Sequence, residues 1–157
     1  MKDSDNDCIF CKITSDEAES SKVYEDDAIL AFMDIQPVVD GQVLVIPKVH
    51  IDHFLDVPDE LAIEMVRISR RISKAVQNKF QPLRMGLIVH GFGVPHAHII
   101  IVPEHDAQDI TSQRMLEIKN GKANFSIRHL RKPPRTELDE IAKELAKILK
   151  ANEAILS

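Results

Sequence analysis

The sequence predicts an α+β fold: an antiparallel sheet of about five strands with one long helix and a C-terminal helix. Three observations lead to this class. Short apolar runs bounded by turn residues occupy residues 22–48 and recur at 84–103, as expected for strands. Between them, apolar residues at steps of three and four mark a long amphipathic helix. A second pattern of the same kind closes the chain.

The first strands form a meander. Residues 22–35 read as two short strands around a turn at 25–27. Residues 41–48 read as a third strand, which ends at Pro47. Connections this short join neighbouring antiparallel strands, so we expect the three to lie side by side.

The long helix is expected within residues 57–80, with Pro58 and Asp59 at its start. Its apolar stripe consists of Leu61, Met65, Ile68, Ile72 and Val76. Such a stripe needs a sheet face to cover it. The strand-like runs 84–91 and 94–103 complete the predicted sheet.

Beyond Pro103 the pattern weakens. Within 104–135 we expect a short helix, a turn at 120–121 and a strand at 124–127. A C-terminal helix follows, with Thr136 as its N-cap and Leu138, Ile141, Leu145 and Ile148 on one face. The basic segment 128–135 is interpreted as a solvated loop in preference to a binding surface.

Composition and charge are those of a globular domain. Hydrophobic residues make up 44% and charged residues 29% of the 157 positions. A net charge of −5 gives no global attraction for nucleic acid polymers or anionic membranes. No run approaches the length of a membrane span, and the N-terminus is acidic, so we expect a cytoplasmic protein. We expect one domain over 1–157, with a core at 8–103 and a C-terminal extension at 104–157.

The segment Val94 to Pro103 sets two histidines at the head of an apolar strand. Strand alternation puts His96, His98 and Ile100 on one face, with the imidazoles about 7 Å apart. A buried imidazole needs a partner for each ring nitrogen, so two on one face favour metal ligation or catalysis over a core role. The glycines just before them fit either a plain turn or a nest of phosphate-binding amides.

Cys8 and Cys11 are the two cysteines of the chain, in a Cys-x-x-Cys pattern. In a reducing compartment this spacing suggests a metal half-site or a redox pair before a structural disulfide. Structural zinc takes four tetrahedral ligands, typically thiolates and imidazoles. A redox pair would be expected in a βαβ context, which the predicted strand order lacks. A metal half-site is therefore one interpretation of the pair, with redox-active and unliganded thiols as the alternatives.

Together these segments resemble the histidine triad (HIT) family of nucleotide hydrolases and transferases. The signature His-x-His-x-His-x-x is matched at His96 and His98, and Ile100 stands where the third histidine is expected. The other similar segments, in the family's order, are 8–13, 23–37 and 41–50. The resemblance implies an antiparallel sheet with a long helix, paired into a homodimer.

The resemblance also implies the site. In the zinc-containing branch, structural Zn²⁺ would be held by Cys8, Cys11, His50 and His96. His98 would attack the α-phosphorus of a nucleoside 5′-phosphate derivative, and water would cleave the resulting nucleotidyl-histidine. The partner would be a purine nucleotide or nucleotide conjugate. Ile9, Phe10, Ile13, Phe32 and Ile35 would surround the base, Asp34 would accept hydrogen bonds from the ribose, and Gly93 and Val94 would lie at the phosphate.

Two departures give an alternative function. Ile100 removes a donor that would face the phosphate, and Phe92 stands where the family has a polar glutamine. Loss of such donors slows phosphoryl transfer, so the alternative is a catalytically weak or inactive nucleotide-binding module. A zinc-stabilised scaffold is the third hypothesis, and His90 or His105 is a candidate to replace the missing donor.

Overall fold

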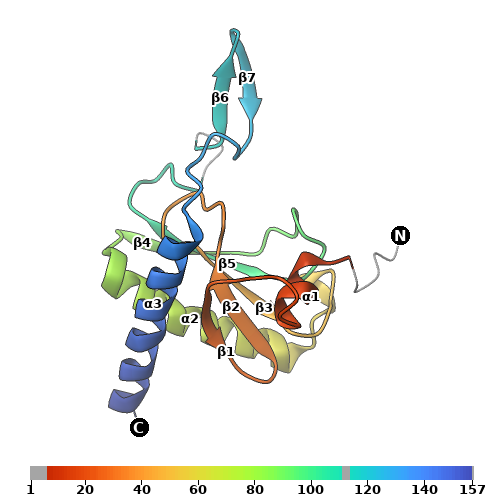
Figure 1. Cartoon of the computed structure of the whole chain (residues 1–157), viewed down its shortest axis with the longest axis vertical. Helices are drawn as coiled ribbons and strands as arrows, with labels where there is room; N and C mark the ends of the chain where they lie inside the picture. The colour runs from red at the N-terminus through yellow and green to blue at the C-terminus, as the bar shows by residue number, and fades with distance from the viewer. Residues whose placement is uncertain (1–6, 111–113, 157) are drawn as a thin grey trace.

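The computed structural model describes residues 7–110 and 114–156. Five strands form one antiparallel sheet in the order β1-β2-β3-β5-β4, and a separate two-stranded hairpin projects from it (Figure 1). The strands are β1 (Lys22–Glu25), β2 (Ile29–Met33), β3 (Val43–Pro47), β4 (Arg84–Ile88), β5 (Ile99–Glu104), β6 (Leu116–Lys119) and β7 (Lys122–Phe125). The helices are α1 (Ile9–Thr14), α2 (Asp59–Phe80), α3 (Arg135–Leu156) and a short 3₁₀ helix, η1 (Phe54–Asp56). The predicted α+β class is confirmed.

The sheet is covered on both faces. The larger core lies between one face and the helices α2 and α3, and its most buried members include Met65, Ile72, Val45, Ile101 and Leu145. The smaller core lies on the other face under α1, and its members are Cys8, Phe10, Ile13, Leu30, Phe32, Leu44 and Ile46. Every residue of β2 and β3 is buried. Strands buried on both faces read as continuous apolar runs, which is the pattern seen in the sequence.

The prediction that both histidines lie within a strand was wrong about where the strand begins. β5 begins at Ile99, and its ladder with β3 begins at the pair Val45 and Ile99. The backbone N–H of Ala97 instead donates to the carbonyl of Ile51 at 2.6 Å. The segment 94–98 therefore runs toward β5 without being part of it.

Both long helices were predicted from their apolar periodicity. α2 follows Pro58 and ends at Phe80, and its C-cap Gln81 has a left-handed φ of 53°. α3 begins at Arg135, so Thr136 lies inside the helix and the predicted N-cap was wrong by two residues. The N–H groups of the first turn bond the carbonyl of Pro134 instead. The buried residues of α3, as far as burial is described along the helix, are Leu138, Ala142, Leu145 and Leu149.

The C-terminal extension forms a hairpin where a short helix was expected. β6 and β7 pair across a two-residue turn at Asn120 and Gly121, whose φ angles of 52° and 73° are both positive. Such a turn matches the twist of the flanking strands. The described residues between 104 and 135 contain this hairpin and turns but no helix, and residues 111–113 lie outside the described part. The strand expected at 124–127 is found at Lys122–Phe125.

No helix in the described part of the chain is both long and apolar enough to cross a membrane. Residues 1–6, which contributed to the expected cytoplasmic location, lie outside the described residues.

Candidate functional site

Two cysteine side chains begin the site. Cys8 is the residue before α1 and Cys11 lies in the first turn of that helix. Residues three apart on a helix share a face, so both thiols point to the same side. Cys8 is buried, Cys11 is partly buried, and both thiols are free of disulfide bonds.

Two histidines from elsewhere in the chain meet these thiols. His50 follows β3, and its Nδ1 lies 3.2 Å from Sγ of Cys11. His96 precedes β5, and its Nδ1 lies 3.5 Å from Sγ of Cys8 and 3.6 Å from Sγ of Cys11. All four ligand atoms lie within 4.8 Å of one another. The structure thus brings together every residue that was predicted to bind metal.

The donor set fits zinc. Ligand atoms of a tetrahedral zinc site are about 3.5 Å apart, close to the three sulfur–nitrogen distances found here. Nε2 of His96 bonds the carbonyl oxygen of Pro47 at 2.9 Å. Because a carbonyl only accepts, Nε2 carries the proton and Nδ1 presents its lone pair to the thiols. A backbone carbonyl that fixes a histidine tautomer in this way is typical of metal ligands.

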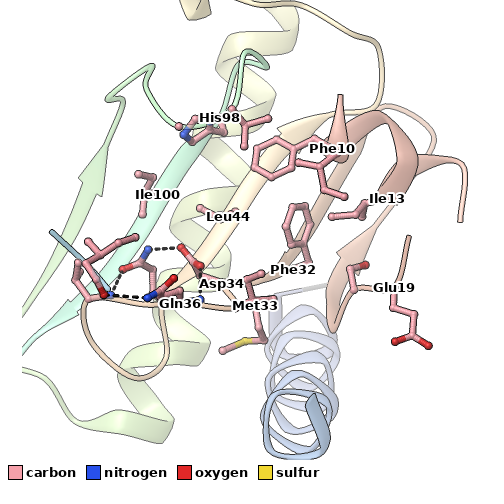
Figure 2. Close-up of a pocket in the computed structure, with 18 of the residues that line it drawn as sticks. Phe10, Ile13, Glu19, Phe32, Met33, Asp34, Gln36, Leu44, His98 and Ile100 are labelled. Atoms are coloured by element: carbon pink, nitrogen blue, oxygen red, sulfur yellow. Dashed lines mark hydrogen bonds between the residues drawn. The ribbon is translucent and has the colours of Figure 1, made fainter. Parts of the chain in front are cut away.

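His98 faces a different space. Its Nδ1 donates to the carbonyl oxygen of His96 at 2.7 Å, which leaves the Nε2 lone pair unprotonated in the neutral ring. The ring of Phe10 lies edge-on to both imidazoles, with centroid distances of 5.8 Å to His96 and 5.7 Å to His98. The two histidines therefore face separate surroundings. His96 lies at the cysteines, and His98 borders a cavity (Figure 2).

The cavity beside His98 has a volume of about 530 Å³. This is within the range of small-molecule pockets. All eight residues predicted to contact nucleotide line it: Ile9, Phe10, Ile13, Phe32, Asp34, Ile35, Gly93 and Val94. The rings of Phe10 and Phe32 meet edge to face, with their centroids 5.4 Å apart, and form one apolar wall of the cavity (Figure 2).

A buried polar network borders the cavity where β2 ends. The carboxylate of Asp34 accepts from the backbone N–H of Gln36 at 2.8 Å and from Nε2 of Gln42 at 2.6 Å. Burial raises the pKa of the Asp34 carboxyl above its ordinary value, while these two hydrogen bonds oppose the rise. Asp34 is thus held in one orientation with lone pairs left for a further donor.

The loop before His96 supplies backbone amides. Gly91 and Gly93 have φ angles of 76° and 96°, which favour glycine. Within the described residues, the amides of Gly93 and Val94 donate no hydrogen bond. Ile100 lines the cavity on the same side as His98 and offers it only hydrocarbon. Neither His90 nor His105 lines the cavity, which leaves neither of them in place to act as the substitute donor.

Sequence reasoning missed part of the lining. The unpredicted residues are Glu19, Ser20, Met33, Gln36, Val38, Gln42, Leu44, Ile127 and Arg135. Gln42 is buried in the strand region, a polar exception that was a usable signal. Arg135 belongs to the basic segment interpreted as a solvated loop. That interpretation was wrong for Arg135, because folding of the C-terminal extension returns it to the cavity.

Comparisons with known proteins agree with this geometry. The HIT domain family model matches residues 15–107. The Hit protein of Bacillus subtilis is 38% identical over 107 residues, which cover 65% of this chain and 74% of that protein. The adenosine 5′-monophosphoramidase of Saccharomyces cerevisiae is 39% identical over 101 residues, covering 63% of each chain. A crystal structure of a zinc-bound histidine triad family protein from Mycobacterium smegmatis has a TM-score of 0.72 at 26% identity, covering 97% of this chain and 99% of that one.

Replacement of His50 tests the metal cluster. We expect about one zinc ion per purified chain, and we expect His50→Ala to lose it because three ligands leave the shell open. His53→Ala is the matched control, since His53 lies three residues away on an exposed surface outside the cluster. Elemental analysis after dialysis against a weak chelator measures the zinc content of each variant. Equal zinc in the two variants would contradict the assignment.

The raised pKa of Asp34 predicts a pH dependence of stability. The Asp34 carboxyl holds its proton more tightly in the folded chain than in the unfolded chain. Its contribution to the free energy of unfolding is therefore full below the ordinary pKa of 3.8 and is lost as the pH rises through the raised pKa of the folded chain. Asp34→Asn stays neutral, so its free energy of unfolding relative to the unmodified chain should rise from below pH 3.8 toward neutral. Urea unfolding across this pH range measures the difference in free energy of unfolding. Asp27→Asn is the control, because Asp27 is exposed. A relative free energy that falls with pH would show that the hydrogen bonds outweigh burial.

Proposed function

The chain belongs to the HIT domain family, and we propose that it cleaves the substituent from the α-phosphate of nucleoside 5′-phosphate derivatives, with His98 as the nucleophile. The observation that supports this most is the hydrogen bond from Nδ1 of His98 to the carbonyl of His96. It fixes the tautomer whose free Nε2 borders the cavity. The related adenosine 5′-monophosphoramidase of Saccharomyces cerevisiae indicates a phosphoramidate as one suitable substrate class.

We propose one orientation for a nucleotide in the cavity. With the α-phosphorus at His98, the apolar wall of Phe10 and Phe32 would lie against the base, together with Ile9, Ile13 and Ile35. Asp34 would accept hydrogen bonds from the vicinal hydroxyls of ribose, which favours ribose over deoxyribose. The free amides of Gly93 and Val94 would donate to phosphoryl oxygens.

The reaction divides into two displacements. In the first, Nε2 of His98 forms a bond to phosphorus and the bond from phosphorus to the leaving group breaks, with the leaving group taking a proton from solvent. In the second, a water oxygen bonds to phosphorus, the nitrogen–phosphorus bond breaks, and the water proton passes to solvent. His98 returns to its starting form and a nucleoside monophosphate is released. The carbonyl of His96 stabilises the ring charge that develops during the first step.

Cys8, Cys11, His50 and His96 would hold a structural zinc ion, whose bonds would stiffen the segment that presents His98. Reduced thiols as ligands are consistent with our proposal of a cytoplasmic location.

We also propose a homodimer, because Ile63 and Val66 of α2 and Leu87 of β4 are exposed apolar residues on neighbouring elements. Packing of α3 on α2 and β1 supports one domain for the whole chain.

A catalytically weak nucleotide-binding module is the second candidate, and one observation favours it. Ile100 places hydrocarbon beside His98, where a donor to the phosphate would assist. The pocket would then bind nucleotide with little turnover.

Single-turnover measurements with a nucleoside 5′-phosphoramidate test the proposed activity. His98→Ala should slow release of the monophosphate by about a thousandfold or more, because the covalent route is lost. His90→Ala is the matched control, since His90 precedes the same segment but does not line the cavity. Release at the same rate from His98→Ala would overturn the enzyme proposal, and no release from the unmodified chain would favour the binding module.

Restoring a histidine separates the two candidates further. Ile100→His should raise the single-turnover rate by about tenfold to a hundredfold, because a donor is added beside the phosphate. Ile100→Val is the control, because it changes the shape of the side chain at position 100 without adding a hydrogen-bond donor. A rate in Ile100→His that is no higher than in Ile100→Val would show that the missing donor does not limit the reaction.

A further inference from the structure

A basic side chain stands at the far end of the cavity. Arg135, the first residue of α3, lines the cavity together with Glu19 and Ser20, which precede β1. Figure 2 shows His98 at one end and Glu19 at the other, with Phe10 and Phe32 between them. Arg135, Glu19 and Ser20 take no part in the chemistry proposed for His98.

The guanidinium of Arg135 is anchored at this end. One of its NH2 groups donates to the backbone carbonyl of Glu19 at 3.3 Å, and the other donates to Oγ of Ser21 at 3.2 Å. Ser21 is buried and in turn donates to the carboxylate of Asp139 at 2.6 Å. These contacts use two of the five N–H donors of an arginine. The remaining donors stay free for a ligand.

The charge around Arg135 disfavours an anionic ligand at this end. Asp16, Glu19 and Asp139 line the adjoining surface, with Lys22 as its other cation. A phosphate there would meet three carboxylates, whereas a neutral base with acceptor atoms would meet the arginine without that repulsion. The hydroxyl of Ser20 is buried and has no hydrogen-bond partner among the described residues.

We propose that Arg135 selects a 6-oxopurine base, that of guanosine or inosine nucleotides, over adenine. The inference rests on the proposed function, which orients the nucleotide with its phosphate at His98 and its base toward Glu19. An arginine fork donates to O6 and N7 of guanine in a bidentate pair, whereas adenine presents an amino donor in place of O6.

Calorimetry with nucleoside monophosphates tests the selection on the unmodified, full-length chain. Guanosine and inosine 5′-monophosphates should bind about tenfold more tightly than adenosine 5′-monophosphate, since both carry O6 and N7. Adenosine monophosphate binding as tightly as guanosine monophosphate overturns the inference and leaves the proposed function standing. Failure of all three to bind contradicts the proposed function, and this inference with it.

Variants of Arg135 assign the effect to the guanidinium. Arg135→Met should lower affinity for guanosine monophosphate to that for adenosine monophosphate, and Arg135→Lys should also lose most of the preference because it lacks the planar fork. Arg131→Met is the matched control, since Arg131 pairs with Asp40 and Glu137 outside the cavity. A preference that persists in a folded Arg135→Met variant overturns the assignment. If that variant does not fold, the folded Arg135→Lys variant decides by the same criterion.

Discussion

The hydrogen bond from Nδ1 of His98 to the carbonyl of His96 is the interaction on which the account depends. It sets the tautomer of the imidazole that borders the cavity, and its acceptor belongs to the residue whose side chain joins the cysteine cluster. Ordering of His96 would therefore also position the acceptor of the His98 hydrogen bond. The second such bond, from Nε2 of His96 to the carbonyl of Pro47, ties the same segment to the end of β3.

The sheet brings these parts together by being covered on both faces. One face buries the larger core under α2 and α3, which supplies the rigidity, and the other carries α1 and the cavity. α1 serves both halves of the site, because Cys8 and Cys11 face the histidines while Ile9, Phe10 and Ile13 line the cavity. Preorganised supports of this kind are what a reactive side chain needs to keep its geometry.

Much of the fold and part of the site could be predicted from the sequence. Apolar periodicity predicted the two long helices, because it reports the buried face of a helix directly, and short apolar runs between turn residues predicted the strands of the sheet. The four metal-binding candidates and the cavity lining came from a resemblance over motifs, and the structure brings these residues into two groups as expected. The start of β5 was missed because the last β3–β5 pair is Val45 with Ile99 and the N–H of Ala97 bonds Ile51, and the local pattern does not contain such long-range pairing. Arg135 was missed because its place depends on the path of the whole C-terminal extension.

Trapping the covalent intermediate tests the central claim most directly. The zinc-loaded chain would be mixed with a nucleoside 5′-phosphoramidate, quenched in alkali within one turnover, digested and measured by mass spectrometry. A nucleotidyl group should appear on His98 and decay before the monophosphate accumulates in full. Release of monophosphate while His98 stays unmodified, or an adduct on another residue, would contradict the account.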